Sequence, residues 1–264
     1  MITNSDPLTA PSPAEVPLPN APLVRVITKI NFPAIVSIGK SEFIAPFQEA
    51  LRETYPVLRP ERTVMIALSN VEAPLPQTTW RFSDVKGAWR VSLAPDFIAM
   101  ETTAYVSRAD FIERLARVVS ALVEHVNPQV IDRIGVRYID RVTGESIHDI
   151  AKLIRPEVIG VIATHAARHV QHAMSESLFA LPDGKAQLLA RWGWMPKDAT
   201  VDPAAIEPID QPSWILDLDI FRAESQPFST ELVLSEVRSY AERIYTVFRW
   251  AVRDDFLRLY GGMV

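Results

Sequence analysis

The stretch TTWRFSDVKGAWRVSLAPDFIAMETT, residues 78–103, contains three extended segments separated by two turn signals. Lys86 and Gly87 mark the first turn, because glycine supplies the positive φ that a tight hairpin requires. Residues 94–96, Ala-Pro-Asp, mark the second turn, where proline occupies a favoured position. Short strands joined by hairpin turns are typical of an antiparallel meander rather than of a parallel sheet.

Helical patterns flank these strands. Ser107 is a plausible N-cap for the helix that follows the meander, with Asp110 as a weak capping-box partner. Ser229 is a plausible cap for the longest helix, residues 229–252. The apolar residues of these two helices recur at helical spacing, which predicts one buried face for each. The expected buried residues are Phe111, Leu115, Val118, Leu122, Val126, Val233, Val237, Tyr240, Ile244 and Phe248.

The pattern of elements predicts an α+β fold in which antiparallel meander sheets are covered by helices. Further strands are expected at residues 23–32, 63–70, 130–142, 168–181, 185–195 and 213–221. Each half of the chain shows strands followed by a covering helix, so we expect two similar lobes, residues 22–144 and 145–264, with their boundary in TGES at residues 143–146. An internal duplication is an open alternative. Residues 1–21 are rich in proline and predict a flexible tail, or a tail that docks on a partner.

Composition excludes several classes of site. The chain has 264 residues and no cysteine, which rules out disulfides, thiolate metal sites and a cysteine nucleophile. No apolar run approaches the ~20 residues that span a bilayer. No lysine or arginine precedes Arg25, so we do not expect a secretory signal. We expect the protein to be cytoplasmic. The net charge of -5 argues against a generally basic nucleic-acid surface.

The segment RIGVRYIDR, residues 133–141, places an arginine at every fourth position. On a strand, Arg133, Arg137 and Arg141 would all point to one face of the sheet. Such a row could be neutralised by carboxylates, bind an anion or RNA phosphate, or contact a protein partner. All three uses are open from the sequence.

Two aspartates offer partners for these arginines. Asp217 and Asp219 lie on one face of the strand WILDLDIF, and the other face holds Trp214, Leu216, Leu218 and Ile220. Their spacing suits ion pairs with Arg137 and Arg141 on an adjacent strand. The same spacing could hold a magnesium ion, but the chain has no nucleotide-binding glycine motif to accompany it. No complete catalytic set is found, and a G-x-S-x-G nucleophile elbow is also absent.

Three histidines form a second candidate cluster. On a helix, His165, His169 and His172 would share one face as zinc ligands do. The segment leads into a strand pattern, where His169 and His172 would face opposite sides. We therefore expect no metal and no cofactor.

Two tryptophans lie close together in the segment RWGWM. Trp192 and Trp194 would share a strand face with Ala190, as a ligand-stacking platform or, by default, as core residues under the long helix.

Several stretches together resemble one known family. They are PLVRVITKINFP, VSLAPDFIAMETTAYVSRADFIERL, RIGVRYIDRV and WILDLDIF, with the closing helix. The chain resembles the uncharacterised bacterial family of sporadically distributed proteins over most of residues 21–260. The resemblance implies a bacterial cytoplasmic protein with patchy inheritance, which is typical of defence or toxin–antitoxin neighbourhoods. It implies no established reaction and no catalytic residues.

The function that we expect is that of a non-catalytic protein-binding or regulatory component of such a locus. An RNA-binding or RNA-cleaving protein that uses the arginine face is the alternative. We expect the partner to be a protein encoded by a neighbouring gene, and we expect the proline-rich tail and the apolar C-terminal segment to contact it. Phe256, Leu259 and Tyr260 are the expected contacts in that segment.

Overall fold

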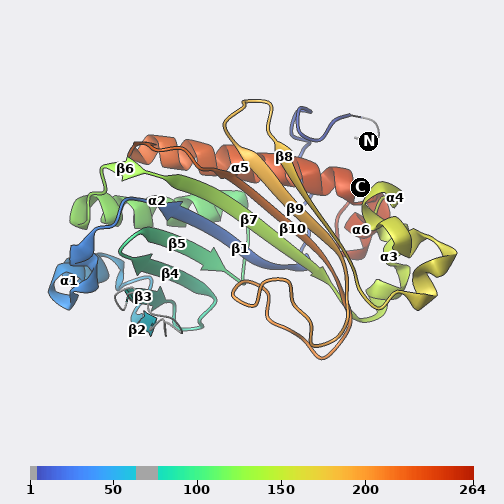
Figure 1. The fold of residues 1–264 in the computed structure, drawn as a ribbon, viewed down its shortest axis with the longest axis horizontal. Helices are drawn as coiled ribbons and strands as arrows, with labels where there is room; N and C mark the ends of the chain where they lie inside the picture. The colour runs from blue at the N-terminus through green and yellow to red at the C-terminus, as the bar shows by residue number, and fades with distance from the viewer. Residues whose placement is uncertain (1–4, 64–76) are drawn as a thin grey trace, which may run out of the picture. The chain divides into compact units, whose positions relative to one another are not determined.

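The computed structural model describes residues 5–63 and 77–264. In these residues, nine strands form one antiparallel sheet in the order β2-β3-β4-β5-β1-β7-β10-β9-β8 (Figure 1). The nine strands are β1 Leu23–Asn31, β2 Val57–Thr63, β3 Gln77–Ser83, β4 Trp89–Ala94, β5 Phe97–Thr102, β7 Arg133–Val142, β8 Ala173–Ala180, β9 Gln187–Met195 and β10 Ser213–Arg222. A separate two-stranded sheet pairs β6 Val130–Ile131 with β11 Gln226–Pro227. The predicted α+β class is confirmed.

Helices lie in several of the connections between strands, and two more follow the last strand. The α-helices are α1 Ser41–Leu51, α2 Arg108–His125, α3 Ile150–Leu153, α4 Pro156–Ile159, α5 Thr230–Ala251 and α6 Asp254–Leu259. The 3-10 helices are η1 Val36–Gly39, η2 Gly144–Asp149, η3 Gly160–Ala163 and η4 His165–His169. Among the described residues, none of these helices combines the length and the hydropathy that crossing a membrane would need.

The chain divides into two compact units that interleave in sequence. One comprises residues 1–26, 136–221 and 239–264, and the other comprises residues 27–135 and 222–238. These are not the two consecutive lobes expected from the sequence, because β1, β7 and α5 each contribute to both units. A boundary at residues 143–146 therefore separates neither unit from the other.

The unit formed by residues 27–135 and 222–238 contains the meander. Strands β3, β4 and β5 pair antiparallel in succession, as residues 78–103 predicted, with Gly87 at a φ of 71° in the first turn. The helix α2 begins where Ser107 accepts a hydrogen bond from the Asp110 amide at 3.2 Å. Its predicted apolar stripe is buried, and Phe111 packs against Trp89 with ring centroids 5.9 Å apart.

One strand prediction in this unit falls outside the described residues, and one strand was missed. The strand expected at residues 63–70 lies almost entirely on residues 64–76, which the structure does not describe. The strand β2 at Val57–Thr63, paired with β3, was not predicted. Pro60 obscured this strand in the sequence, because proline lacks the amide donor of a central strand and is tolerated at a sheet edge.

The second unit contains β8, β9, β10 and most of β7. The hairpin between β8 and β9 turns at Gly184, which has a φ of 69°. The helix α5, which begins in the other unit and ends in this one, starts with a hydrogen bond from the Leu232 amide to Ser229 Oγ at 3.3 Å. Its expected apolar stripe is buried along the whole helix, so periodicity identified the correct face.

The N-terminal segment, residues 5–21, is not the free tail expected from the sequence. It lies beside the C-terminal half of α5 (Figure 1) and makes hydrogen bonds to three α5 side chains. The Asn20 amide also donates to the Tyr260 carbonyl at 3.3 Å. Composition did not reveal this docking, because the contacts join residues more than 200 positions apart.

Candidate functional site

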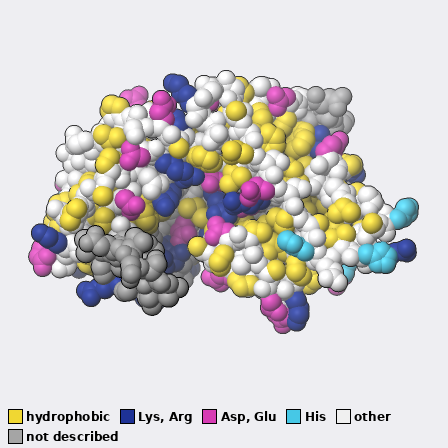
Figure 2. All heavy atoms as spheres, viewed as in Figure 1, with side chains coloured by type: hydrophobic (Ala, Val, Ile, Leu, Met, Phe, Trp, Pro, Cys, Tyr) yellow, Lys and Arg dark blue, Asp and Glu magenta, His cyan; other side chains and the backbone are white. Residues whose placement is uncertain are grey.

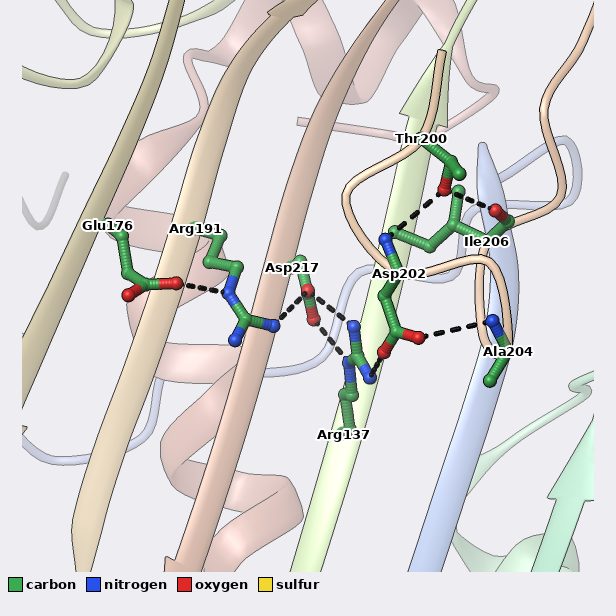
Figure 3. Close-up of polar contacts among 8 residues, drawn as sticks. All are labelled: Arg137, Glu176, Arg191, Thr200, Asp202, Ala204, Ile206 and Asp217. Atoms are coloured by element: carbon green, nitrogen blue, oxygen red, sulfur yellow. Dashed lines mark hydrogen bonds and ion pairs between the residues drawn. The ribbon is translucent and has the colours of Figure 1, made fainter. Parts of the chain in front are cut away.

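A row of five alternating charges crosses four strands of the second unit and the connection between β9 and β10 (Figure 3). Arg191 Nε on β9 donates to Glu176 Oε2 on β8 at 2.6 Å, and Arg191 Nη1 lies 3.5 Å from Asp217 Oδ2 on β10. Arg137 on β7 donates through Nε and Nη2 to both Asp217 oxygens at 2.7 Å. Arg137 Nη1 donates to Asp202 Oδ2 at 2.6 Å. We call these five residues the charged row.

Strand register explains why the row forms. Asp217 lies opposite Arg191 in the β10–β9 pair, and Glu176 lies opposite Arg191 in the β8–β9 pair. Residues opposite each other in an antiparallel pair point to the same face, so opposite charges meet across each step. The predicted ion pair between Arg137 and Asp217 is present and takes the bidentate form that a guanidinium favours.

The two residues at the centre of the charged row, Arg137 and Asp217, are largely buried and therefore serve the fold. The Asp217 side chain is 1% exposed and that of Arg137 is 14% exposed. Burial lowers the pKa of Arg137, but hydrogen bonds and the negative charges of Asp217 and Asp202 outweigh burial and raise the pKa above its usual range. Because Nε, Nη1 and Nη2 all have carboxylate partners, Arg137 has little capacity left to bind a ligand anion.

The connection between β9 and β10 supplies Asp202, which sequence reasoning missed. Asp202 Oδ1 accepts from the Ala204 amide at 3.2 Å, and the Asp202 amide donates to Thr200 Oγ1 at 3.2 Å. Burial raises the pKa of Asp202, but the hydrogen bond and charge of Arg137 and the amides of Ala204 and Ala205 lower it overall. The only local signal was Asp202 followed by Pro203. This pair predicts a turn, but it does not predict which arginine Asp202 will bind.

The other predicted basic residues do not join the row. Arg141 has Glu207 as its neighbouring acid, not the expected Asp219. In antiparallel strands, pairing Arg137 with Asp217 carries Asp219 away from Arg141. Within the described chain, Arg141 Nε and Nη2 are enclosed and have no hydrogen-bond partner, and burial lowers the Arg141 pKa.

Arg133 lies at the start of β7, in the other compact unit. It is half-buried and has an interaction within the protein. Asp219 on β10 is also half-buried and engaged. The three arginines therefore differ in environment, although they share one strand.

The C-terminal contact candidates have mixed placements. Phe256 is buried, with its ring centroid 5.7 Å from that of Phe248 and 4.7 Å from that of Tyr260. It is a core residue rather than part of an exposed patch, because α6 folds back onto α5. Leu259 is 48% exposed, and Tyr260 is half-buried.

The histidines precede β8 instead of lying on it or on an α-helix. His165 and His169 belong to η4, and His169 Nε2 accepts from Arg168 Nε at 3.0 Å. Figure 2 shows histidine side chains at the end of the viewed face formed by the short helices between β7 and β8. Across residues 5–63 and 77–264, no three His, Asp or Glu side chains are grouped so that they could hold a metal ion.

The tryptophans Trp192 and Trp194 lie on one face of the sheet, beside residues of β10. Trp192 lies opposite Leu216 and Trp194 opposite Trp214 in the β9–β10 register. Both are half-buried, whereas Trp214 is fully buried. The two tryptophans thus extend the apolar layer on the side of the sheet opposite the charged row.

Strand β8 forms one edge of the sheet. Strand β8 ends the sheet order and, in the described residues, pairs with β9 alone. Its sequence, AMSESLFA, has one charged residue, and Leu178 is 58% exposed. Figure 2 shows hydrophobic side chains at the surface over β8 and β9.

The strand at the other end of the sheet order has a different character. Strand β2, VLRPERT, carries Pro60 and three charged residues. Proline and charge are devices that prevent an edge strand from pairing with another chain. Strand β8 lacks both, apart from Glu176, which is tied to Arg191.

Comparison with known proteins identifies no relative. No protein-family model matches the chain, and no curated protein matches it. The family resemblance stated from the sequence stays a prediction.

Proposed function

We propose that this chain is a non-catalytic protein-binding component that accepts an extended segment of a partner protein along the outer edge of β8. The observation that carries the proposal is the open, nearly uncharged edge of an eight-residue strand. Addition of a strand satisfies the unpaired backbone donors and acceptors of such an edge, and side chains on alternate positions supply specificity. Strand β2, with its proline and its charges, is poorly suited to the same role.

The charged row supports protein binding over RNA binding. Its three carboxylates outnumber its two guanidinium groups, and Arg137 is saturated by Asp217 and Asp202. The unpartnered nitrogens of Arg141 are enclosed, so they offer no accessible donors to a phosphate. A phosphate-binding surface needs accessible cationic donors.

The chemistry of β8 defines the segment that it would accept. Met174, Glu176 and Leu178 alternate with Ser175, Ser177 and Phe179 along the strand. A complementary strand would be largely uncharged and would place a basic residue near Glu176, whose side chain is 63% exposed. Opposite charges across adjacent strands stabilise pairing, and like charges oppose it.

The test uses purified proteins encoded by the neighbouring genes, with binding measured by calorimetry. Leu178→Lys places a charge on the exposed edge and should weaken binding about fivefold, near the upper range for one cross-strand contact. Ser177→Pro would distort the edge and should weaken binding further. Val36→Lys changes an apolar residue on η1 that is 81% exposed, more than Leu178, and should leave affinity unchanged.

Equal affinities for all of these variants would rule out the β8 edge. If no neighbour product binds, and labelled RNA binds with a steep salt dependence that Arg133→Ala reduces, the RNA alternative replaces this proposal. The defence or toxin–antitoxin setting and the cytoplasmic location rest on the family resemblance and on composition. The identities of the neighbouring genes test the first, and fractionation of the native cells tests the second.

A further inference from the structure

The docked N-terminal segment is held mainly through its backbone. Arg243 Nη1 donates to the carbonyls of Pro7 at 2.9 Å and Ala10 at 2.7 Å. Tyr245 Oη accepts from the Val16 amide at 2.8 Å and donates to the Ala14 carbonyl at 3.3 Å. Pro7 and Ala10 lie in a turn, in which the Ala10 amide donates to the Asp6 carbonyl at 2.9 Å, and residues 11–18 have no regular secondary structure. The surface therefore binds carbonyls of a turn and of the non-helical stretch that follows it.

A third α5 side chain completes the contact surface. Arg249 Nη1 donates to the Ala14 carbonyl at 3.5 Å and to Tyr245 Oη at 3.2 Å. The Tyr245 ring stacks near Phe248, with centroids 6.2 Å apart. We call Arg243, Tyr245 and Arg249 the segment-binding surface.

The bound segment has the composition expected for such a surface. Residues 5–21 contain five prolines, at positions 7, 11, 13, 17 and 19, together with Asp6 and Glu15. Proline favours an extended conformation that loses little entropy on binding. The two acidic residues match the positive charge of Arg243 and Arg249.

The apolar attachment of the segment is small. Ala10 is its one buried residue among positions 5–21, and the half-buried ones are Pro7, Leu8, Pro13, Val16 and Leu18. A Cβ on Gly262 would lie 2.8 Å from side-chain atoms of both Val16 and Leu18, so the C-terminal glycine permits this approach. Segments with few buried apolar contacts open at low free energy while the rest of the protein stays folded.

We propose that the segment-binding surface is a recognition site for acidic, proline-rich segments of other proteins that form a turn followed by a non-helical stretch, and that residues 5–21 are its exchangeable internal ligand. A partner segment of this chemistry displaces the N-terminal segment and makes the same carbonyl contacts. This inference goes beyond the β8 edge and does not depend on it. The internal ligand is at high effective concentration, on the order of millimolar, so a single free peptide competes only near that range.

Displacement is tested on the full chain. Because the chain has no cysteine, Ser12→Cys gives one site for a fluorophore on the exposed part of the segment. A synthetic peptide of residues 5–21 should lower the anisotropy of the label saturably at millimolar concentration. A peptide of equal charge with alanine in place of proline should act much more weakly. A label at Val85→Cys, 83% exposed in the other unit, should not respond.

Arg243→Gln provides the second arm of the test. It removes a charged donor shared by two carbonyls, and it should raise the open population of the segment about tenfold, since such hydrogen bonds contribute about 1.5 kcal/mol or more. The label on this variant should be mobile before any peptide is added. A fixed anisotropy at all peptide concentrations, or an unchanged anisotropy in Arg243→Gln, would overturn the proposal. A response that follows protein concentration and doubles the mass in light scattering would identify a second copy as the occupant and would also overturn it.

Discussion

Asp217 illustrates how one buried carboxylate organises its surroundings. It accepts two hydrogen bonds from Arg137 and lies within 3.5 Å of Arg191. We expect Asp217→Ala to destabilise the protein by about 3–5 kcal/mol, because it leaves Nε and Nη2 of Arg137 without partners and only Asp202 to offset the Arg137 charge. Glu176→Gln, at the exposed end of the same row, should cost less than about 1 kcal/mol. Urea unfolding of both variants measures the contrast, and equal costs would show that burial does not decide the contribution.

Asp140 supplies a pH dependence. Burial raises its pKa to about 7, from 3.8 for a free side chain. Between these values the folded chain keeps a proton that the unfolded chain has lost, so stability falls as pH rises from about 4 to about 7 and stays reduced above that. Nearby Tyr260, whose own pKa is raised by burial, hydrogen-bonds Ser146 and faces the Asp140 charge.

The substitution Asp140→Asn removes this titration. Relative to the unmodified chain, the variant should gain stability as pH rises, by about 1.4 kcal/mol for each pH unit between 4 and 7. Urea unfolding at pH 4, 5.5 and 8 measures the difference. Asp149→Asn, at an exposed aspartate, serves as the control. A stability difference independent of pH would contradict the assigned titration.

Among the elements, the β8–β9 hairpin depends on one glycine. A Cβ on Gly193 would lie 2.0 Å from the Ala173 carbonyl oxygen, a backbone atom that cannot move alone. Gly193→Ala should therefore separate the start of β8 from β9 and accelerate amide hydrogen exchange along β8 by tenfold or more, since each 1.4 kcal/mol of lost protection is tenfold. Gly39→Ala, where no atom lies within 4 Å, should leave exchange in β8 unchanged. Unaltered β8 exchange in Gly193→Ala would show that the strand pairing tolerates the extra atom.

Elements were predictable where their signals are local. The Ser107 and Ser229 caps, the meander turns and the buried stripes of α2 and α5 depend on residues within a few turns of one another. The strand β2 and the helix α6 were missed, because Pro60 and the break before Asp254 mask their periodicity. The edge position of β8 could not be predicted either, because the sequence of a strand does not determine how many other strands pair with it.

For the whole molecule, the consecutive order of lobes was the main error. Repeated strand-then-helix patterns suggested a boundary at residues 143–146, yet β1, β7 and α5 run through both units. A long helix or strand buries its apolar face over its full length, so one part of it can pack in the core of one unit and the rest in the core of the other. Chain order is therefore a poor guide to the compact units of this protein.

The amino-acid pattern was sufficient for the α+β class, the antiparallel hairpins, the starts of α2 and α5 and the exclusion of cysteine chemistry. It also suggested the Arg137–Asp217 pair from matched spacing. The approach of Asp202 to Arg137, the docking of residues 5–21 on α5 and the open edge of β8 emerged only from the folded chain. Backbone periodicity and turn chemistry act between near neighbours, whereas these contacts join residues 65 to 236 positions apart and exist only after the whole core has packed.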